Sequence, residues 1–132
     1  MKRIAIMTAA ALCLLVQGAC NRTASRVEAV AETFLKAYYA DDKAAMAAVC
    51  TPAFAAWMQE NESQVVLPEE TERIIKEALS RTSFKIVSVE VDKEAASARV
   101  RYELKVPYLD KPVPKALTLQ LEGRTARVDG IE

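Results

Sequence analysis

The hydrophobic residues of this chain change their spacing near Ser83, and this change constrains the fold more than any other feature. Before Ser83 the apolar residues recur every three or four positions, which is the spacing of a helix with one buried face. After Ser83 they alternate with polar residues, which is the spacing of a strand with one buried and one solvated face. We therefore predict one α+β domain, in which N-terminal helices pack on a four-stranded antiparallel meander.

Four helices are expected before the change in spacing. Asp41 and Asp42 precede the second helix and are expected to cap it rather than to act as catalysts, and Thr51 with Pro52 supplies the cap and the first position of the third. The predicted bounds are about 25–40, 43–50, 52–60 and 68–81. The apolar side chains that the fourth helix is expected to bury are Ile74, Ile75, Ala78 and Leu79.

Four strands are expected after it, with the bounds 84–91, 96–106, 117–121 and 125–131. The apolar phase of the first strand slips between Ile86 and Val87, which indicates a β-bulge. The prolines at positions 107, 112 and 114 predict a long connection before the third strand. Gly123 predicts a tight turn before the fourth.

The beginning of the chain has the features of a targeting segment. Lys2 and Arg3 give it a basic start, and the uncharged apolar run of residues 4–16 is too short for a bilayer, which needs about 20 apolar residues. A short apolar run after basic residues is typical of a secretory signal peptide. Gly18 and Ala19 then supply the small residues that a signal peptidase requires before its cut.

The stretch LLVQGACN, residues 14–21, resembles the lipobox of bacterial lipoproteins, in which two small residues precede a cysteine that receives lipid. Gly18, Ala19 and Cys20 match that pattern, whereas Gln17 stands where Leu is usual. The resemblance implies lipidation of Cys20. The domain organisation that follows is a signal peptide at 1–19, a lipidated tether at 20–24 and a folded domain at 25–132.

Lipidation of Cys20 would make the membrane a partner of the protein, because two or more acyl chains give stable attachment. Asn21, rather than Asp, follows the cysteine, and by analogy with lipoproteins this favours the outer membrane of a bacterial cell envelope, on the side that faces the periplasm. The alternative is ordinary cleavage after Ala19, which would release a soluble periplasmic protein.

Two longer stretches, VAETFLKAYYADDKAAMAAVCTP and LTLQLEGRTARVDGIE, carry a second resemblance. With the order of the elements, they resemble the cone-shaped nuclear transport factor 2-like superfamily, in its branch of bacterial lipoprotein domains of unknown function. The resemblance covers about Ser25 to Ile131, and Thr125 stands where relatives often have Trp. That superfamily contains dehydratases, isomerases, aldol cyclases and non-catalytic binding proteins, so the resemblance implies a fold and does not choose an activity.

The residue types present exclude several kinds of site. The chain has no His, which rules out Ser-His and Cys-His activation and His-bearing metal sites. Cys50 is the single cysteine of the predicted domain, so it is expected to be a small buried residue, and a thiolate zinc site is excluded. We predict no metal and no cofactor. The 18 basic residues are balanced by 18 acidic ones, so we also predict no binding of nucleic acid.

The strand pattern also bears on catalysis. Tyr102 falls on the inward side of its strand, whereas Glu103 and Glu122 fall on outward sides, so no carboxylate is placed where burial would make it a base. We therefore predict no catalytic residue and a non-enzymatic binding or interaction domain. The alternative is a lyase or isomerase that uses a carboxylate beside a Tyr in a cone-shaped pocket.

Aromatic residues on apolar faces are the candidates for a pocket where the helices and the sheet diverge. These candidates are Phe34, Tyr38, Trp57 and Tyr102. Ordinary core packing explains the same residues without a ligand. A pocket would suit a small apolar ligand, and the other expected partner is an envelope protein. Arg99, Arg101 and Lys105 lie on the outer sheet face among acidic residues, which favours a solvated face or a homodimer surface.

Overall fold

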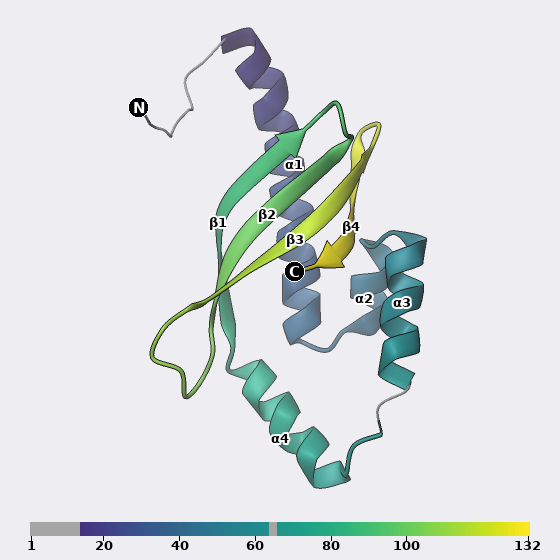
Figure 1. Cartoon of the computed structure of the whole chain (residues 1–132), viewed down its shortest axis with the longest axis vertical. Coiled ribbons are helices and arrows are strands. Elements are labelled where there is room, and N and C mark those ends of the chain that lie inside the picture. The colour runs from purple at the N-terminus through teal and green to yellow at the C-terminus, as the bar shows by residue number, and fades with distance from the viewer. Residues whose placement is uncertain (1–13, 64–65) are drawn as a thin grey trace.

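The computed structural model describes the backbone of residues 14–63 and 66–132, with the side chains of 22–61 and 66–132. Its strands form one antiparallel sheet in the order β1-β2-β3-β4, after the helices (Figure 1). The predicted α+β layout, with helices followed by a four-stranded antiparallel meander, is confirmed. The elements are α1 (Leu14–Tyr39), α2 (Lys43–Ala48), α3 (Pro52–Ser63), α4 (Glu69–Ser80), β1 (Ser83–Asp92), β2 (Ser97–Lys105), β3 (Val113–Glu122) and β4 (Thr125–Ile131).

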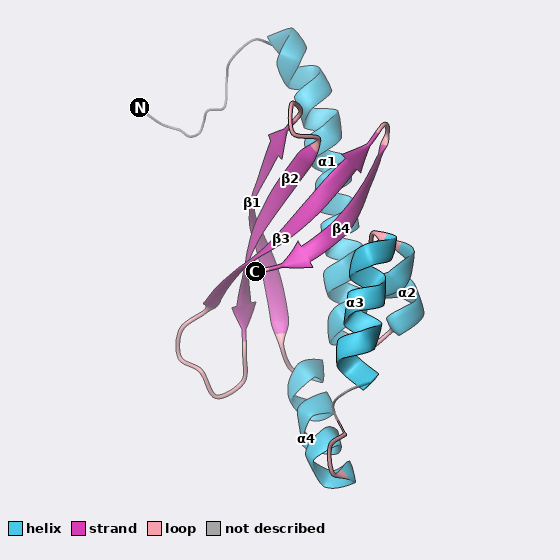
Figure 2. Ribbon diagram, turned by 45° about the vertical axis from the view of Figure 1, so that its right-hand side comes forward, coloured by secondary structure: helices cyan, strands magenta, loops and turns pink. Residues whose placement is uncertain are grey.

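The core lies between α1 and one face of the sheet, which α1 crosses in both views (Figures 1 and 2). The buried residues of α1 recur at helical spacing, and those of the strands alternate as predicted. Removing a side chain such as Phe34 from water stabilises the fold by roughly 2 kcal/mol. The largest fully buried side chains are Val27, Phe34, Leu35, Cys50, Val100, Leu117, Leu119 and Val128.

The start of α1 differs from the prediction. The helix was expected to begin near Ser25 after a short polar tether, but it begins at Leu14, so residues 21–24 are helical. Polarity is a poor guide to a helix boundary here, because Asn21 to Ala24 contain neither Pro nor Gly and can continue a helix. Of the signal-peptide prediction, residues 1–13 lie outside the described part of the chain, whereas Cys20 lies on the described backbone of α1.

The two short helices are capped as the sequence predicts. The Asp42 carboxylate accepts a hydrogen bond from the Ala45 N–H at 3.1 Å, and Asp41 provides the turn before it with a φ of 57°. The Thr51 hydroxyl accepts from the Phe54 N–H at 3.2 Å, which fixes the start of α3. α3 then continues to Ser63, beyond the loop predicted to begin at Asn61.

The connection between α2 and α3 is joined to the sheet by its backbone. The Thr51 N–H donates to the Val128 carbonyl at 2.9 Å, and the Val128 N–H donates to the Val49 carbonyl at 2.8 Å. Cys50 and Val128 therefore form a short parallel bridge on the outer edge of β4. This pairing holds both short helices beside the end of the sheet, where Figure 2 shows them.

In the sheet, one sequence prediction is confirmed and one is wrong. The register of β1 on β2 shifts between Ile86 and Ser88, so the predicted bulge is present at Val87. Pro114, however, lies inside β3 rather than in the connection before it. A proline is tolerated there because β4 pairs with β3 only from Leu117 onward, so Pro114 has a neighbouring strand on one side only.

The packing of α4 also differs from the prediction. Ile74 is 58% exposed and Ile75 is 42% exposed, although both were expected to be buried. Figure 1 shows α4 at the end of the molecule opposite to the start of α1. The apolar spacing correctly placed these residues on one side of a helix, but spacing does not determine whether another element covers that side.

Candidate ligand cavity

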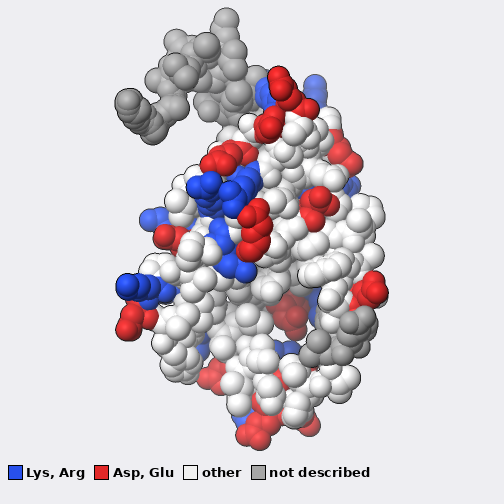
Figure 3. Space-filling model, in the orientation of Figure 1, with Lys and Arg blue, Asp and Glu red and all other residues white. Residues whose placement is uncertain are grey.

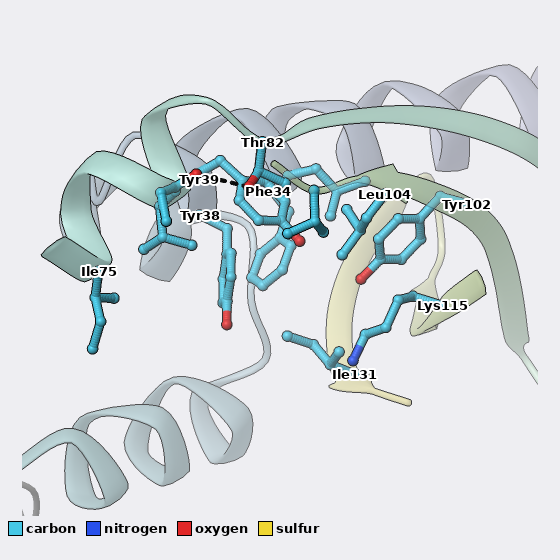
Figure 4. A pocket seen from close by; sticks show the side chains of 13 residues that line it. Phe34, Tyr38, Tyr39, Ile75, Thr82, Tyr102, Leu104, Lys115 and Ile131 are labelled. Atoms are coloured by element: carbon cyan, nitrogen blue, oxygen red, sulfur yellow. Dashed lines mark hydrogen bonds between the residues drawn. The ribbon is translucent and has the colours of Figure 1, made fainter. Parts of the chain in front are cut away.

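A half-open cavity of about 310 Å³ lies where α1, α4 and the inner face of the sheet diverge (Figure 4). Its walls are mostly aliphatic and aromatic side chains. This volume is at the lower end of the range for small-molecule sites, which is roughly 300–1,000 Å³. The lining residues are Phe34, Leu35, Tyr38, Tyr39, Ile75, Ala78, Leu79, Thr82, Tyr102, Leu104, Val106, Lys115 and Ile131.

The Tyr102 hydroxyl is the most deeply placed polar group of the cavity. The residue is only 2% exposed, and Figure 4 shows its hydroxyl directed into the cavity. Within the described part of the chain, no residue forms a hydrogen bond with this hydroxyl. Thr82 differs, because its hydroxyl donates to the Ala78 carbonyl at 2.9 Å. A buried polar group normally has a partner, so Tyr102 offers an unused donor.

Burial keeps the cavity phenols protonated. It raises the pKa of Tyr102 to about 12, with a smaller contribution from Tyr38. Burial also raises the pKa of Tyr39 well above its ordinary value, and the neighbouring phenols Tyr102 and Tyr38 add to that shift. At neutral pH Tyr39 and Tyr102 are therefore hydrogen-bond donors and not bases.

Lys115 places a positive charge on the inner side of the sheet. It is opposite Tyr102 in the β2–β3 register, it is half-buried, and its side chain extends along the cavity below that ring (Figure 4). No carboxylate of the described side chains lies within ion-pair distance of its ammonium group. The sequence contained a signal for this residue, because Lys115 continues the inward alternation of Leu117 and Leu119.

Three of the four predicted pocket residues meet at this cavity, namely Phe34, Tyr38 and Tyr102. Trp57 does not line it. This residue is 57% exposed on α3, and its ring stacks on Phe54 with the centroids 5.8 Å apart. Phe54 in turn contacts Phe34, at 6.2 Å, so Trp57 is joined to the core through one intervening ring.

Trp57 borders a second, larger hollow of about 660 Å³ between α4 and the two short helices. Figure 3 shows the surface hollowed in this region. Tyr38, Leu79 and Ile131 line both spaces, so the two hollows adjoin. The larger one also has Met46 and Met58 in its wall, and methionine side chains adapt easily to apolar molecules of different shape.

The described residues provide little else for chemistry. Thr51 is also buried, and its hydroxyl donates to the Asp129 carboxylate at 2.8 Å. Burial raises the pKa of Cys50 to about 11, so its thiol stays protonated at neutral pH and is a poor nucleophile. No group of three potential metal ligands occurs in the part of the chain that the structure describes.

The outer face of the sheet carries two ion pairs within the chain. Arg99 contacts Glu132 at 2.6 Å, and Arg101 contacts Glu90 at 3.6 Å. In Figure 3 basic and acidic side chains accordingly lie next to one another on this face. A surface of alternating, paired charges offers no strong site for a free anion.

Comparisons with known proteins found no match to the chain among family models, curated proteins or solved structures. None of the helices in the described residues combines the length and the apolar character needed to span a bilayer.

Proposed function

We propose that this protein is a bacterial envelope lipoprotein, held to the membrane through Cys20, whose folded domain is a non-catalytic module that binds a small, largely apolar molecule. The cavity between α1, α4 and the sheet is the observation that carries the binding function. Its walls are mainly apolar, and a few polar groups, among them Tyr102 and Lys115 on the sheet side, lie within them, which is the usual construction of a small-molecule site.

Binding is favoured over catalysis by the kind of polar groups that the cavity contains. Tyr39 and Tyr102 are protonated, and the cavity lining includes no carboxylate to act as a base beside them. The lyase or isomerase alternative needs such a base. A donor-rich, base-free cavity can orient a ligand but has no group to take a proton from it.

We propose that the domain belongs to the nuclear transport factor 2-like superfamily. The basis is the resemblance of its two sequence stretches, together with a long helix packed across a four-stranded meander and a cavity between them. Such domains occur in both enzymes and binding proteins, so this proposal concerns the fold alone. The proposed binding function rests on the residues of the cavity.

The membrane attachment rests on the lipobox resemblance at Cys20. Along α1, at about 1.5 Å per residue, Tyr38 lies roughly 27 Å from Cys20. An anchored protein would therefore hold its cavity away from the bilayer surface. We propose the outer membrane, with the domain in the periplasm, as the location.

Fractionation and mass spectrometry test the attachment together. The protein expressed with its own N-terminus should sediment with membranes, and its first residue should be Cys20 carrying acyl chains. Cys20→Ser should move it to the soluble fraction. A soluble wild-type protein that begins with an unmodified Cys20 would show that cleavage follows Ala19 and that there is no anchor.

A second candidate function is docking of an envelope protein, which the exposed apolar residues of α4 favour. Ile74 and Ile75 are uncovered on this helix, and Leu109 is exposed in the loop after β2, toward the same end of the molecule (Figure 1). A photo-crosslinker at Ile74 in cells should give a discrete product if a partner docks here, whereas one at Lys76, an exposed position on another side of α4, is the control and should not. The homodimer through the outer sheet face stays a prediction, for which sedimentation equilibrium is the measurement.

A further inference from the structure

We infer that the ligand of the α1–α4 cavity is an amphiphile with a carboxylate head, held at the sheet end by Lys115 and the Tyr102 hydroxyl, with its apolar body between α1 and α4. This inference rests on the proposed binding function and names the chemical class of the ligand. A neutral apolar molecule would fill the same walls but would leave both polar groups without a partner.

Lys115 carries the charge that selects the head group. Its ammonium group lines a mainly apolar cavity, and within the described side chains it has no carboxylate partner. The nearest acidic residue in the β2–β3 register is Glu103, which is exposed on the outer face. A partly desolvated cation is stabilised by an anion that enters the same space, so Lys115 selects for negative charge.

Tyr102 supplies a second contact for the head group. Its neighbour across the β2–β3 ladder is Lys115, and its hydroxyl is buried, protonated and without an acceptor in the described residues. A carboxylate has two oxygens, so it can accept from the ammonium group and from the phenol at the same time. The ammonium group of Lys115 repels a cationic head, so ammonium amphiphiles are disfavoured in this arrangement.

The walls define the rest of the ligand. Phe34, Leu79 and Leu104 are among the apolar side chains that line the cavity together with the two polar groups. The adjoining hollow, about 660 Å³, continues past Tyr38 toward Trp57, so an alkyl chain longer than the first cavity has apolar surface to follow. Burial of each methylene there would add to affinity, as is usual for alkyl chains.

Isothermal titration of the full chain with decanoate, below its micelle concentration, tests the inference. Decan-1-ol and decyltrimethylammonium are probes with the same chain and a neutral or positive head. Decanoate should bind the unaltered protein about tenfold more tightly than decan-1-ol, which is the usual gain from one charge-assisted contact. Decyltrimethylammonium should bind more weakly than either.

Substitutions test which residues hold the carboxylate head of the ligand. Lys115→Met keeps the aliphatic stem and should remove the preference for decanoate while leaving decan-1-ol binding within about twofold. Tyr102→Phe should weaken decanoate by a smaller factor. Lys105→Met, on the exposed outer face of the neighbouring strand, is the matched control and should change neither probe. If Lys115→Met does not fold, Lys115→Gln and the three probes on the unaltered protein still show whether Lys115 holds a carboxylate head.

The outcomes separate the two proposals. Equal binding of decanoate and decan-1-ol, or decanoate binding that Lys115→Met leaves unchanged, would overturn the carboxylate head while the apolar binding function stands. If none of the three probes binds, both the ligand class and the cavity function are wrong. A preference for decanoate that Lys115→Met abolishes and Lys105→Met preserves would support both.

Discussion

Lys115 and Tyr102 are direct neighbours in the β2–β3 ladder, and both line the same cavity on the inner face of the sheet. A lysine on this face is unusual because the residues that follow it at the same phase, Leu117 and Leu119, are fully buried core. The pair marks the point where the filled core gives way to a cavity. The rest of the fold holds this pair in place.

Phe34 is the residue whose truncation should be most costly. It is completely buried between α1 and the sheet, so Phe34→Ala should lower the free energy of unfolding by about 3–5 kcal/mol through lost burial and the cavity left behind. Urea denaturation measures the difference. Ile74→Ala, at an exposed position of α4, is the control and should cost less than about 1 kcal/mol. Equal losses would mean that α4 packs more tightly than its exposure indicates.

The hydroxyl of Thr51 should matter more than its size. It caps α3 through the Phe54 N–H and also donates to Asp129, so Thr51→Val should destabilise the protein by about 1–2 kcal/mol. Thr51→Ser keeps the hydroxyl and should retain most of the stability. Thermal unfolding followed by circular dichroism compares the two variants, and a Ser variant as unstable as the Val variant would argue against the cap.

Gly130 should not tolerate a side chain while Thr118 is intact. A Cβ at Gly130 would lie 2.8 Å from the Thr118 Oγ1, closer than van der Waals contact allows, and the two residues are paired across β3 and β4. Gly130→Ala should therefore be destabilising by about 1–3 kcal/mol. A double-mutant cycle with Thr118→Ala should recover part of this loss, whereas Thr118→Val, which keeps the branch, should not. Additive effects in both cycles would exclude the clash.

Alkaline pH should weaken the fold through Cys50. Its pKa is about 11 in the folded protein and 9.0 ordinarily, so between these values the unfolded chain releases a proton that the folded chain retains. Stability is therefore unaffected by this group below pH 9 and falls as the pH rises toward 11, by on the order of 2 kcal/mol. Cys50→Ala removes this contribution.

Unfolding free energies of wild type and Cys50→Ala at pH 8 and pH 11 measure the effect. The wild type should lose more stability between the two pH values than the variant does. The same loss in both would mean that the Cys50 thiol ionises at its ordinary pKa in the folded state.

Local sequence patterns predicted the elements well and their contacts less well. Residues on one face of a strand share one environment, so the apolar pattern follows the backbone geometry. This is why the alternation of apolar residues from Ala98 to Leu104 predicted the strand, and the change of phase after Ile86 predicted the bulge. The caps at Asp42 and Thr51 were predictable for a similar reason, since each acts on an N–H three residues away.

The features that the sequence left undetermined depend on packing between distant elements. Trp57 and Ile75 are apolar residues at helical spacing, and the sequence does not show what they contact. The tertiary arrangement places Trp57 at the larger hollow. It places Ile75 at the cavity, where the side chain stays partly exposed. Lys115 was not predicted to lie on a strand, because the nearby prolines predicted a loop. Pro114 is compatible with a strand only because β4 is too short to pair with it, which is a property of the whole sheet.

The backbone pairing of Val128 with Val49 and Thr51 has a consequence for how copies of this protein could associate. The short connection occupies hydrogen-bonding groups on the β4 side of the sheet, whereas β1, among the described strands, has a partner on one side only. Strand addition along β4 would have to break this bridge, so β1 is the side of the sheet that a second copy can extend without rearrangement. Two molecules joined β1 to β1 would use up both growing sides, so strand addition between copies would stop at a closed pair.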